Sequence, residues 1–435
     1  MSQLTLRAGF GKQDITPPVG SRMHGFHGRD RDHGCEGVRD PLFARALWLE
    51  QGDERVLIVA FDLLFFDRAE DNKLRGALGR ALGFSSRRIL TNCSHTHAGP
   101  MTHIWASGMF TPIDRLYTDS LCERVVRAAE QARERAVPVT MRVGETRTDM
   151  PMSRRLLDSS GKAQFAPNPD GTVYDYLPMC LFEAADGSPV CLLFSVACHP
   201  SAICDFLISA DYPGTAMRLI GARLGSQCSM FLQGVGGDAK PRTLVQDGQF
   251  RCSAEGAEEA GRLVGECVVA ALNGGLQPVE PALAARFEEV HCEMAPIPER
   301  SFFEALADES ERDELRREWA RYTLRKLDRG EELPRVIPLS VHGIKLGNGV
   351  RLVGLEGEAV AELGHVIRSF FGSGITFSLG YTDGCQLYLP TEKVLNEGGY
   401  EAVSYYEYAW PAPFAHGVEG AVNEALLRLR ASGID

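Results

Sequence analysis

The chain is organised around Arg88-Ile89-Leu90-Thr91-Asn92-Cys93-Ser94-His95-Thr96-His97-Ala98-Gly99-Pro100, where an apolar run leads into two histidines. An extended chain repeats its side-chain direction every second residue, so we expect His95 and His97 on the same side of a strand. Gly99-Pro100 predicts the end of that strand, and ligands in open α/β sheets bind at the carboxyl ends of strands. Two neutral imidazoles there predict a first-row metal site; the alternative is a pair of hydrogen-bonded strand-end histidines.

Strand and helix patterns alternate on both sides of this stretch. Residues 56–66 are almost wholly apolar, which is typical of a strand covered on both faces. Residues 68–83 and 117–135 have helical spacing of their apolar side chains. This alternation predicts an α/β fold, and the absence of a linker or repeat predicts a single large domain over 1–435.

Residues 298–333 differ from the rest because they are dense in charge, with apolar residues at roughly helical spacing. We predict a helical insertion in the domain. Its role stays open between a lid, a contact in a homo-oligomer, and a solvated helix packed on its own domain.

Composition excludes some functions. The chain has 435 residues, is 44% hydrophobic and 24% charged, and carries a formal net charge of −12. The negative charge argues against a nucleic-acid or anionic-membrane partner. The 12 cysteines contain no CxxC pair and often lie in apolar runs, which predicts buried, reduced thiols. Since the first residues lack a signal-peptide pattern, we expect a cytoplasmic location.

Several further segments repeat one arrangement, in which an apolar strand ends in a ligand-type side chain beside Gly or Pro. His199 precedes Pro200, Glu358 follows Gly357, and Tyr388 lies on a later strand. Residues placed in this way converge on one cleft although they are far apart in the sequence. Two histidines and one carboxylate are a common catalytic zinc set that leaves a position for water.

Together these motifs resemble the neutral/alkaline, non-lysosomal ceramidase family of zinc amidases. The likeness extends over about residues 7 to 425. The motifs that carry it are, in order, Asp14-Ile15-Thr16-Pro17, Ser94-His95-Thr96-His97-Ala98-Gly99-Pro100, Gly237-Asp238-Ala239-Lys240-Pro241, Gly357-Glu358 and Leu387-Tyr388-Leu389-Pro390-Thr391. The resemblance implies a ceramidase-type catalytic domain, with a mixed β-sheet core flanked by helices.

The resemblance also implies a metal site. By that correspondence His95, His199, Glu358 and Tyr388 would bind Zn²⁺, and His97 would face the substrate carbonyl or hold the water.

Other active-site residues of the family can be matched to positions of this chain, with two departures. Arg154 matches the arginine of an Asn-Arg motif, although Ser153 replaces the asparagine, and Tyr400 matches a tyrosine that would donate to the oxyanion. Lys240 stands where the family has an active-centre serine. It would bind a substrate carboxylate, or act as a proton donor if it is buried. The alternative is a surface lysine on a turn.

These inferences predict a zinc-dependent hydrolase that cleaves the amide bond of a small polar N-acyl compound. A substrate that carries an anionic group is one option. The expected partner is a small molecule, with no nucleic acid and no membrane. Two alternatives stay open: an esterase or lactonase on the same metal site, and a metal-binding homologue without catalysis.

Overall fold

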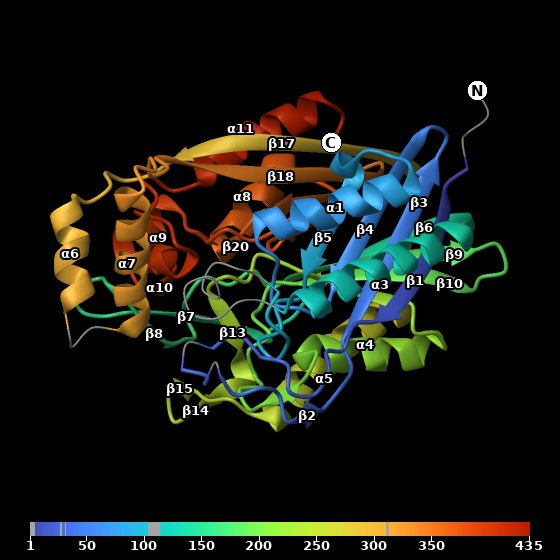
Figure 1. Ribbon diagram of the computed structural model, residues 1–435. Helices are drawn as coiled ribbons and strands as arrows, with labels where there is room; N and C mark the ends of the chain where they lie inside the picture. The colour runs from blue at the N-terminus through green and yellow to red at the C-terminus, as the bar shows by residue number, and fades with distance from the viewer. Residues whose placement is uncertain (1–4, 27, 31, 103–113, 310–312) are drawn as a thin grey trace.

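The computed structural model describes residues 5–26, 28–30, 32–102, 114–309 and 313–435. A large mixed sheet packs on a smaller one, and helices cover the outer faces of both (Figure 1). This arrangement confirms the predicted fold class, a mixed β-sheet core flanked by helices. No helix in the described ranges is both long and apolar enough to cross a bilayer.

The large sheet has the strand order β12-β10-β9-β6-β1-β3-β4-β5, with β16 paired to β6. Its strands are β1 (Arg7–Asp14), β3 (Phe43–Gln51), β4 (Glu54–Phe61), β5 (Ile89–Cys93), β6 (Val137–Arg147), β9 (Tyr176–Ala184), β10 (Pro189–Val196), β12 (Ser229–Gln233) and β16 (Gln277–Val279). The pairs β4/β5 and β10/β12 are parallel.

The smaller sheet has the order β17-β18-β19-β21. Its strands are β17 (Pro281–Glu293), β18 (Val336–Gly347), β19 (Val350–Leu355) and β21 (Ile375–Leu379). Short strands form further small sheets: β2 (Gly37–Val38) with β11 (Leu207–Ile208), β7 (Pro151–Leu157) with β8 (Ala163–Asn168) and β13 (Ala239–Pro241), β14 (Val245–Gln246) with β15 (Gln249–Phe250), and β20 (Glu358–Ala359) with β22 (Tyr388–Leu389).

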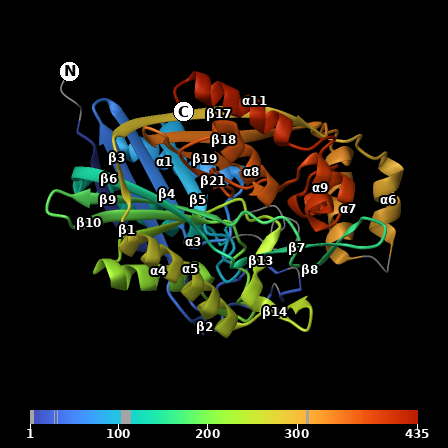
Figure 2. The same ribbon diagram turned by 180° about the vertical axis from the view of Figure 1, so that it is seen from behind.

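The helices divide between the two outer faces (Figure 2). Those on the large sheet are α1 (Arg68–Leu82), α3 (Arg115–Glu134), α4 (Asp211–Leu224) and α5 (Ala254–Gly274). Those on the small sheet are α8 (Ala361–Phe371) and α11 (Glu419–Ala431). Elsewhere lie α6 (Arg300–Asp308), α7 (Glu314–Asp328), α9 (Glu392–Glu397), α10 (Tyr400–Val403) and the 3₁₀ helices η1 (Ser86–Arg88), η2 (Arg242–Leu244) and η3 (Ser404–Tyr408).

Alternation along β3 builds two cores from one strand. Leu47 and Leu49 point into the space between the sheets, whereas Ala46 and Trp48 point toward α1 and α3. The boundaries of α1 follow local chemistry. The Asp67 side chain accepts from the Glu70 N–H at its start, and Gly83 ends it in the left-handed region. The sequence predicted this helix within one residue.

The edge strands of the large sheet meet through one amide side chain. Asn92, in β5, accepts from the Gln233 N–H of β12 at 2.7 Å. Its amide nitrogen donates to Gly380 O, just past β21, at 2.8 Å. Asn92 therefore joins both edges of the large sheet to the small one beside the His-x-His segment.

All 12 cysteines lie within the described residues, and none forms a disulfide. Most are buried, as the prediction for their packing requires, and their reduced state stays a prediction. The exceptions with exposed side chains are Cys204 and Cys252.

Candidate metal centre

Glu358 and Tyr388 are brought together by a short parallel ribbon. Strands β20 and β22 pair with Glu358 opposite Tyr388, and the Glu358 N–H donates to Leu387 O at 3.0 Å. Neighbouring residues in such a ribbon project from the same face. Thus a register of backbone pairing fixes two oxygen donors that lie far apart in the sequence.

The prediction that one strand continues through His95 and His97 is wrong, because the strand ends before them. β5 stops at Cys93, and His95 has a φ of 67°, an uncommon left-handed conformation for a histidine. The bend arises at His95. The Ser94 N–H still donates to Phe61 O in step with the pairing of β4 and β5, whereas the His95 N–H donates to Leu63 O, one residue out of step. Strand alternation therefore does not align the two rings, although their centroids lie only 4.8 Å apart.

Each of two histidines is oriented through one ring nitrogen. His95 Nδ1 lies 3.0 Å from Leu64 O, and His199 Nδ1 lies 2.7 Å from Gly236 O. A nitrogen bound to a carbonyl must carry its proton, which leaves each Nε2 as a lone-pair donor. Burial, followed by the charge of Arg154, lowers the pKa of His199 to about 3, which keeps its ring neutral.

The candidate ligand atoms are spaced as ligands of one ion would be. His95 Nε2 and His199 Nε2 lie 3.3 and 3.2 Å from Glu358 Oε2, and the Tyr388 hydroxyl lies 3.3 Å from His199 Nε2. A tetrahedral zinc ion with bonds of about 2.0–2.1 Å separates its ligand atoms by roughly 3.3–3.4 Å. Two imidazoles, a carboxylate and a phenol oxygen therefore fit a zinc-sized ion.

His97 lies on the wall of the same cavity as His95, Glu358 and Tyr388, which has a volume of about 50 Å³. Neither of its ring nitrogens has a hydrogen-bond partner among the described residues. In that part of the chain, nitrogens of His95, His97 and His199 lie within 4.8 Å of one another, so a three-histidine site is the alternative. The histidine nitrogens are up to 4.8 Å apart, which is more than the 3.2–3.3 Å between Glu358 and the nitrogens of His95 and His199. The shorter spacing favours the set that contains Glu358.

Close packing fixes the backbone at His97. Gly25 has a φ of 119°, and a Cβ there would lie 2.8 Å from the Cβ of His97. On the other side, Arg29 Nη1 donates to His97 O at 2.7 Å and Nη2 donates to Asp205 O at 3.1 Å. The segment after β5 is thus clamped to the loop that follows His199.

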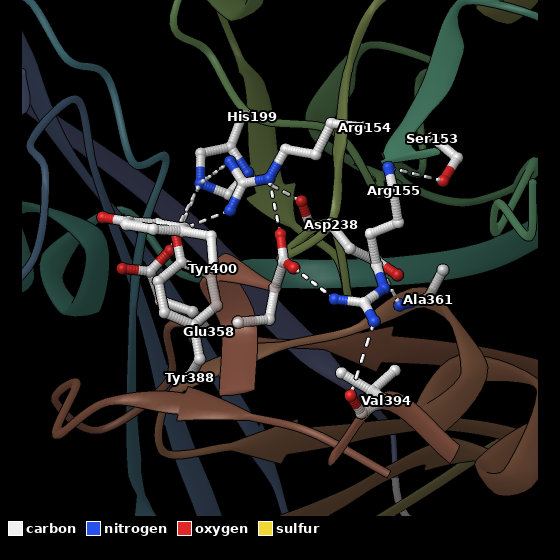
Figure 3. A network of polar contacts seen from close by, with 12 residues as sticks. Ser153, Arg154, Arg155, His199, Asp238, Glu358, Ala361, Tyr388, Val394 and Tyr400 are labelled. Carbon is white, nitrogen blue, oxygen red and sulfur yellow. Dashed lines mark hydrogen bonds and ion pairs between the residues drawn. The ribbon is translucent and has the colours of Figure 1, made fainter. Parts of the chain in front are cut away.

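Arg154 lies beside the donor set and contacts two of its members (Figure 3). Its Nη2 donates to the Tyr388 hydroxyl at 3.0 Å, and its Nε donates to Glu401 Oε1 at 2.8 Å. Its Nη1 has one contact among the described residues, at 3.5 Å from His199 Nε2. Arg154 therefore lies at the edge of this donor set, and its role in catalysis stays a prediction.

Two other predicted residues occupy different settings from those expected. The Tyr400 hydroxyl lines the cavity but donates to Glu407 Oε2 at 2.9 Å, so its proton is engaged. Lys240 lies in β13, paired with Met152 of β7, and not on a surface turn, which was the alternative considered for it. Non-local strand pairing explains this difference. Burial, followed by the charge of Arg154, lowers the pKa of Lys240 to about 8.

The sequence predictions missed two tyrosines. The Tyr408 hydroxyl donates to Glu358 Oε1, and the Tyr381 hydroxyl donates to Glu358 Oε2 at 3.3 Å. Tyr381 follows Gly380 at the end of an apolar strand, so the strand-end pattern could have identified it. Tyr408 belongs to η3 and carries no such pattern.

The charged segment 298–333 forms a pair of helices, α6 and α7, with residues 310–312 outside the described part (Figure 1). The Trp319 indole N–H donates to Trp410 O at 2.9 Å, and its ring packs on Tyr405 of η3. Leu315, at the start of α7, lines the cavity. The helices therefore pack on the domain and contribute to the wall of the site.

No protein-family model matches the chain, and a comparison with curated proteins found no match. Solved structures do match it. The crystal structure of neutral ceramidase from Pseudomonas aeruginosa has a TM-score of 0.75 and 18% identity, covering 99% of this chain and 75% of that chain. A ceramidase complexed with C2 has a TM-score of 0.76 and 17% identity, covering 99% and 76%. The chain thus has the fold of these ceramidases, as the sequence resemblance predicted.

Proposed function

We propose that this chain of neutral-ceramidase fold is a zinc-dependent hydrolase that cleaves the amide bond of a small polar N-acyl compound. The observation that carries the proposal is the spacing of 3.2–3.3 Å among candidate ligand atoms of His95, His199, Glu358 and Tyr388. When bound there, zinc would supply Lewis acidity, polarising a carbonyl and lowering the pKa of a water molecule toward neutrality.

His97 is the general base of the proposal. It would accept a proton from the attacking water at a ring nitrogen. The support is geometric, since both nitrogens lack partners in the described part of the chain and the ring lies on the cavity wall. A base needs a free lone pair within reach of the proton that it removes.

Arg154 would stabilise negative charge on the carbonyl oxygen. Its Nε and Nη2 are held by Glu401 and Tyr388, which fixes the guanidinium plane, and Nη1 remains available to donate. A fixed donor at a developing oxyanion contributes about 2.7–4 kcal/mol in well-studied enzymes. Tyr400 is the weaker candidate for this role because Glu407 already accepts its proton.

The overall reaction adds one water across the C–N bond. The water oxygen bonds to the acyl carbon, the C–N bond breaks, and one proton moves to the leaving nitrogen. The products are a carboxylic acid and an amine. An ester would need less help at its leaving group, so matched substrates are needed to separate the two reactions.

The experiment combines elemental analysis with a panel of matched N-acyl amides and O-acyl esters. About one zinc per chain with amide turnover supports the proposal, whereas ester turnover alone would make the protein an esterase. Metal without turnover would indicate a non-catalytic homologue. His95→Ala should lose the metal, and His291→Ala, at an exposed position on β17, is the matched control that should keep it.

We also propose a cytoplasmic, reducing environment. It is supported by the 12 cysteines, none of which is in a disulfide in the described structure.

A further inference from the structure

Lys240 is a partly buried cation beside the proposed active site. Its ammonium lies 5.9 Å from the ring centroid of Phe165 and 5.7 Å from that of Phe250. No carboxylate within the described residues forms an ion pair with it. The nearby Asp238 side chain instead accepts from the Ala361 N–H at 2.8 Å. A buried ammonium without an acidic partner is costly to a protein unless a ligand compensates it.

The neighbouring charges are already balanced. Arg154 pairs with Glu401 Oε1 at 2.8 Å, and Arg155 pairs with Glu401 Oε2 at 2.5 Å and with Glu397 at 3.1 Å. Two guanidiniums therefore face two carboxylates. Within the described residues Lys240 forms no ion pair of its own, and the buried Asp211 is the carboxylate whose charge acts on it without a direct contact.

Aromatic rings connect Lys240 to the cavity. The Phe165 ring lies 5.0 Å from the guanidinium of Arg154 and packs edge-on against Tyr400, whose ring centroid is 6.1 Å away. Tyr400 lines the cavity together with His97, and the charge of Lys240 contributes to the lowered pKa of His97. A group bound at Lys240 would thus lie close to an amide bound at the donor set.

We propose that Lys240 binds a carboxylate of the substrate, so that the substrates of the proposed hydrolase are N-acylated amino acids or similar monoanions. The inference rests on the proposed function for the reaction and on Lys240 for the substrate class. One cation without an ion-pair partner among the described residues matches one negative charge, which favours a carboxylate over a doubly charged phosphate. Phe165 and Phe250 flank the ammonium and would offer apolar contact to the substrate beside its carboxylate.

The test compares pairs of substrates that differ in charge but little in shape. N-acetyl-L-leucine and N-acetyl-L-leucinamide are incubated with the zinc-loaded protein, and acetate release is measured. N-acetylphosphoethanolamine is the dianionic comparison. We expect kcat/KM for the carboxylate to exceed that for the carboxamide by at least about tenfold, or about 1.4 kcal/mol. A preference for the carboxamide or the phosphate would overturn the proposal.

Variants of Lys240 separate charge from shape. Lys240→Met should reduce the carboxylate-to-carboxamide ratio to about one, and Lys240→Arg should retain most of it because the charge remains. Lys162→Met removes the charge of an exposed lysine and is the matched control. Circular dichroism confirms that each variant is folded. An unchanged ratio in folded Lys240→Met contradicts the proposal.

A binding measurement distinguishes this proposal from the function on which it rests. Calorimetric titration of the zinc-loaded protein with N-acetyl-L-leucine should give an affinity that Lys240→Met lowers at least about tenfold. If this result appears without turnover of any amide, the proposed function fails and the carboxylate site stands. If amides are hydrolysed without preference for the acid, the carboxylate site fails and the function stands.

Discussion

Tyr408→Phe tests how the centre holds its carboxylate ligand. The Tyr408 hydroxyl donates to Glu358 Oε1, the oxygen opposite the one that faces His95 and His199. The phenyl ring remains in place, so the substitution removes one hydrogen bond from a buried environment. Glu358 would then turn more freely about its χ angles, and its second oxygen would be less well directed at the ion.

The expected size follows from the kind of bond that is lost. A hydrogen bond to a charged group contributes about 1.5–3 kcal/mol, and loss of an outer partner of a metal ligand typically costs about 10–100-fold in affinity. We therefore expect zinc affinity to fall by roughly 10- to 150-fold. Competition with a chromophoric chelator measures the dissociation constant directly.

Tyr405→Phe is the matched control for this measurement. Tyr405 lies in the same 3₁₀ helix, but its ring packs on Trp319, 5.8 Å away between centroids. Removing the Tyr405 hydroxyl should leave zinc affinity within about twofold of that of the unsubstituted protein, since Tyr405 contacts no proposed ligand. Equal affinities for Tyr408→Phe and Tyr405→Phe would refute the reasoning that Tyr408 positions Glu358.

Other predictions concern the base, the backbone, the helical pair and pH. His97→Ala should retain about one zinc per chain and lose at least about 100-fold in kcat, consistent with general-base catalysis; loss of the metal would instead make it a ligand. Gly25→Ala forces a Cβ against His97 at a φ of 119° and should lower kcat/KM at least tenfold, or about 1.4 kcal/mol, with metal content unchanged. Trp319→Ala removes a buried indole that donates to Trp410 O and should lower the free energy of unfolding by about 3–5 kcal/mol in denaturant titrations, an effect that a change below about 1 kcal/mol would contradict. Because burial and Arg154 lower the pKa of Lys240 to about 8, the preference for carboxylate substrates should disappear as pH rises through about 8, and Lys240→Arg should extend it to higher pH.

The sequence predicted the fold class because strand and helix patterns are local. The strand-end pattern grouped His95 and His97 with His199, Glu358 and Tyr388, and the family resemblance implied that His95, His199, Glu358 and Tyr388 are the ligands. The structure brings these four side chains within contact of one another, and their roles remain predictions.

Features that depend on distant pairing were not predicted. The bend at His95 depends on the carbonyl of residue 63, which the stretch itself does not contain. Lys240 is in a strand only because β7 pairs with it. Tyr408 reaches Glu358 because η3 packs against the ribbon of β20 and β22, and no periodicity within 404–408 indicates that contact.

The origin of the four donors has a consequence for how the chain assembles. His95 and His199 follow strands of the large sheet, whereas Glu358 and Tyr388 belong to the ribbon next to the small one. An ion held by all four would act as a cross-link between the first half of the chain and its last quarter. Its binding free energy would then add to folding, by about 4 kcal/mol at a free concentration a thousand times the dissociation constant. Maturation of the protein would accordingly end with metal capture, when the two sheets have already docked.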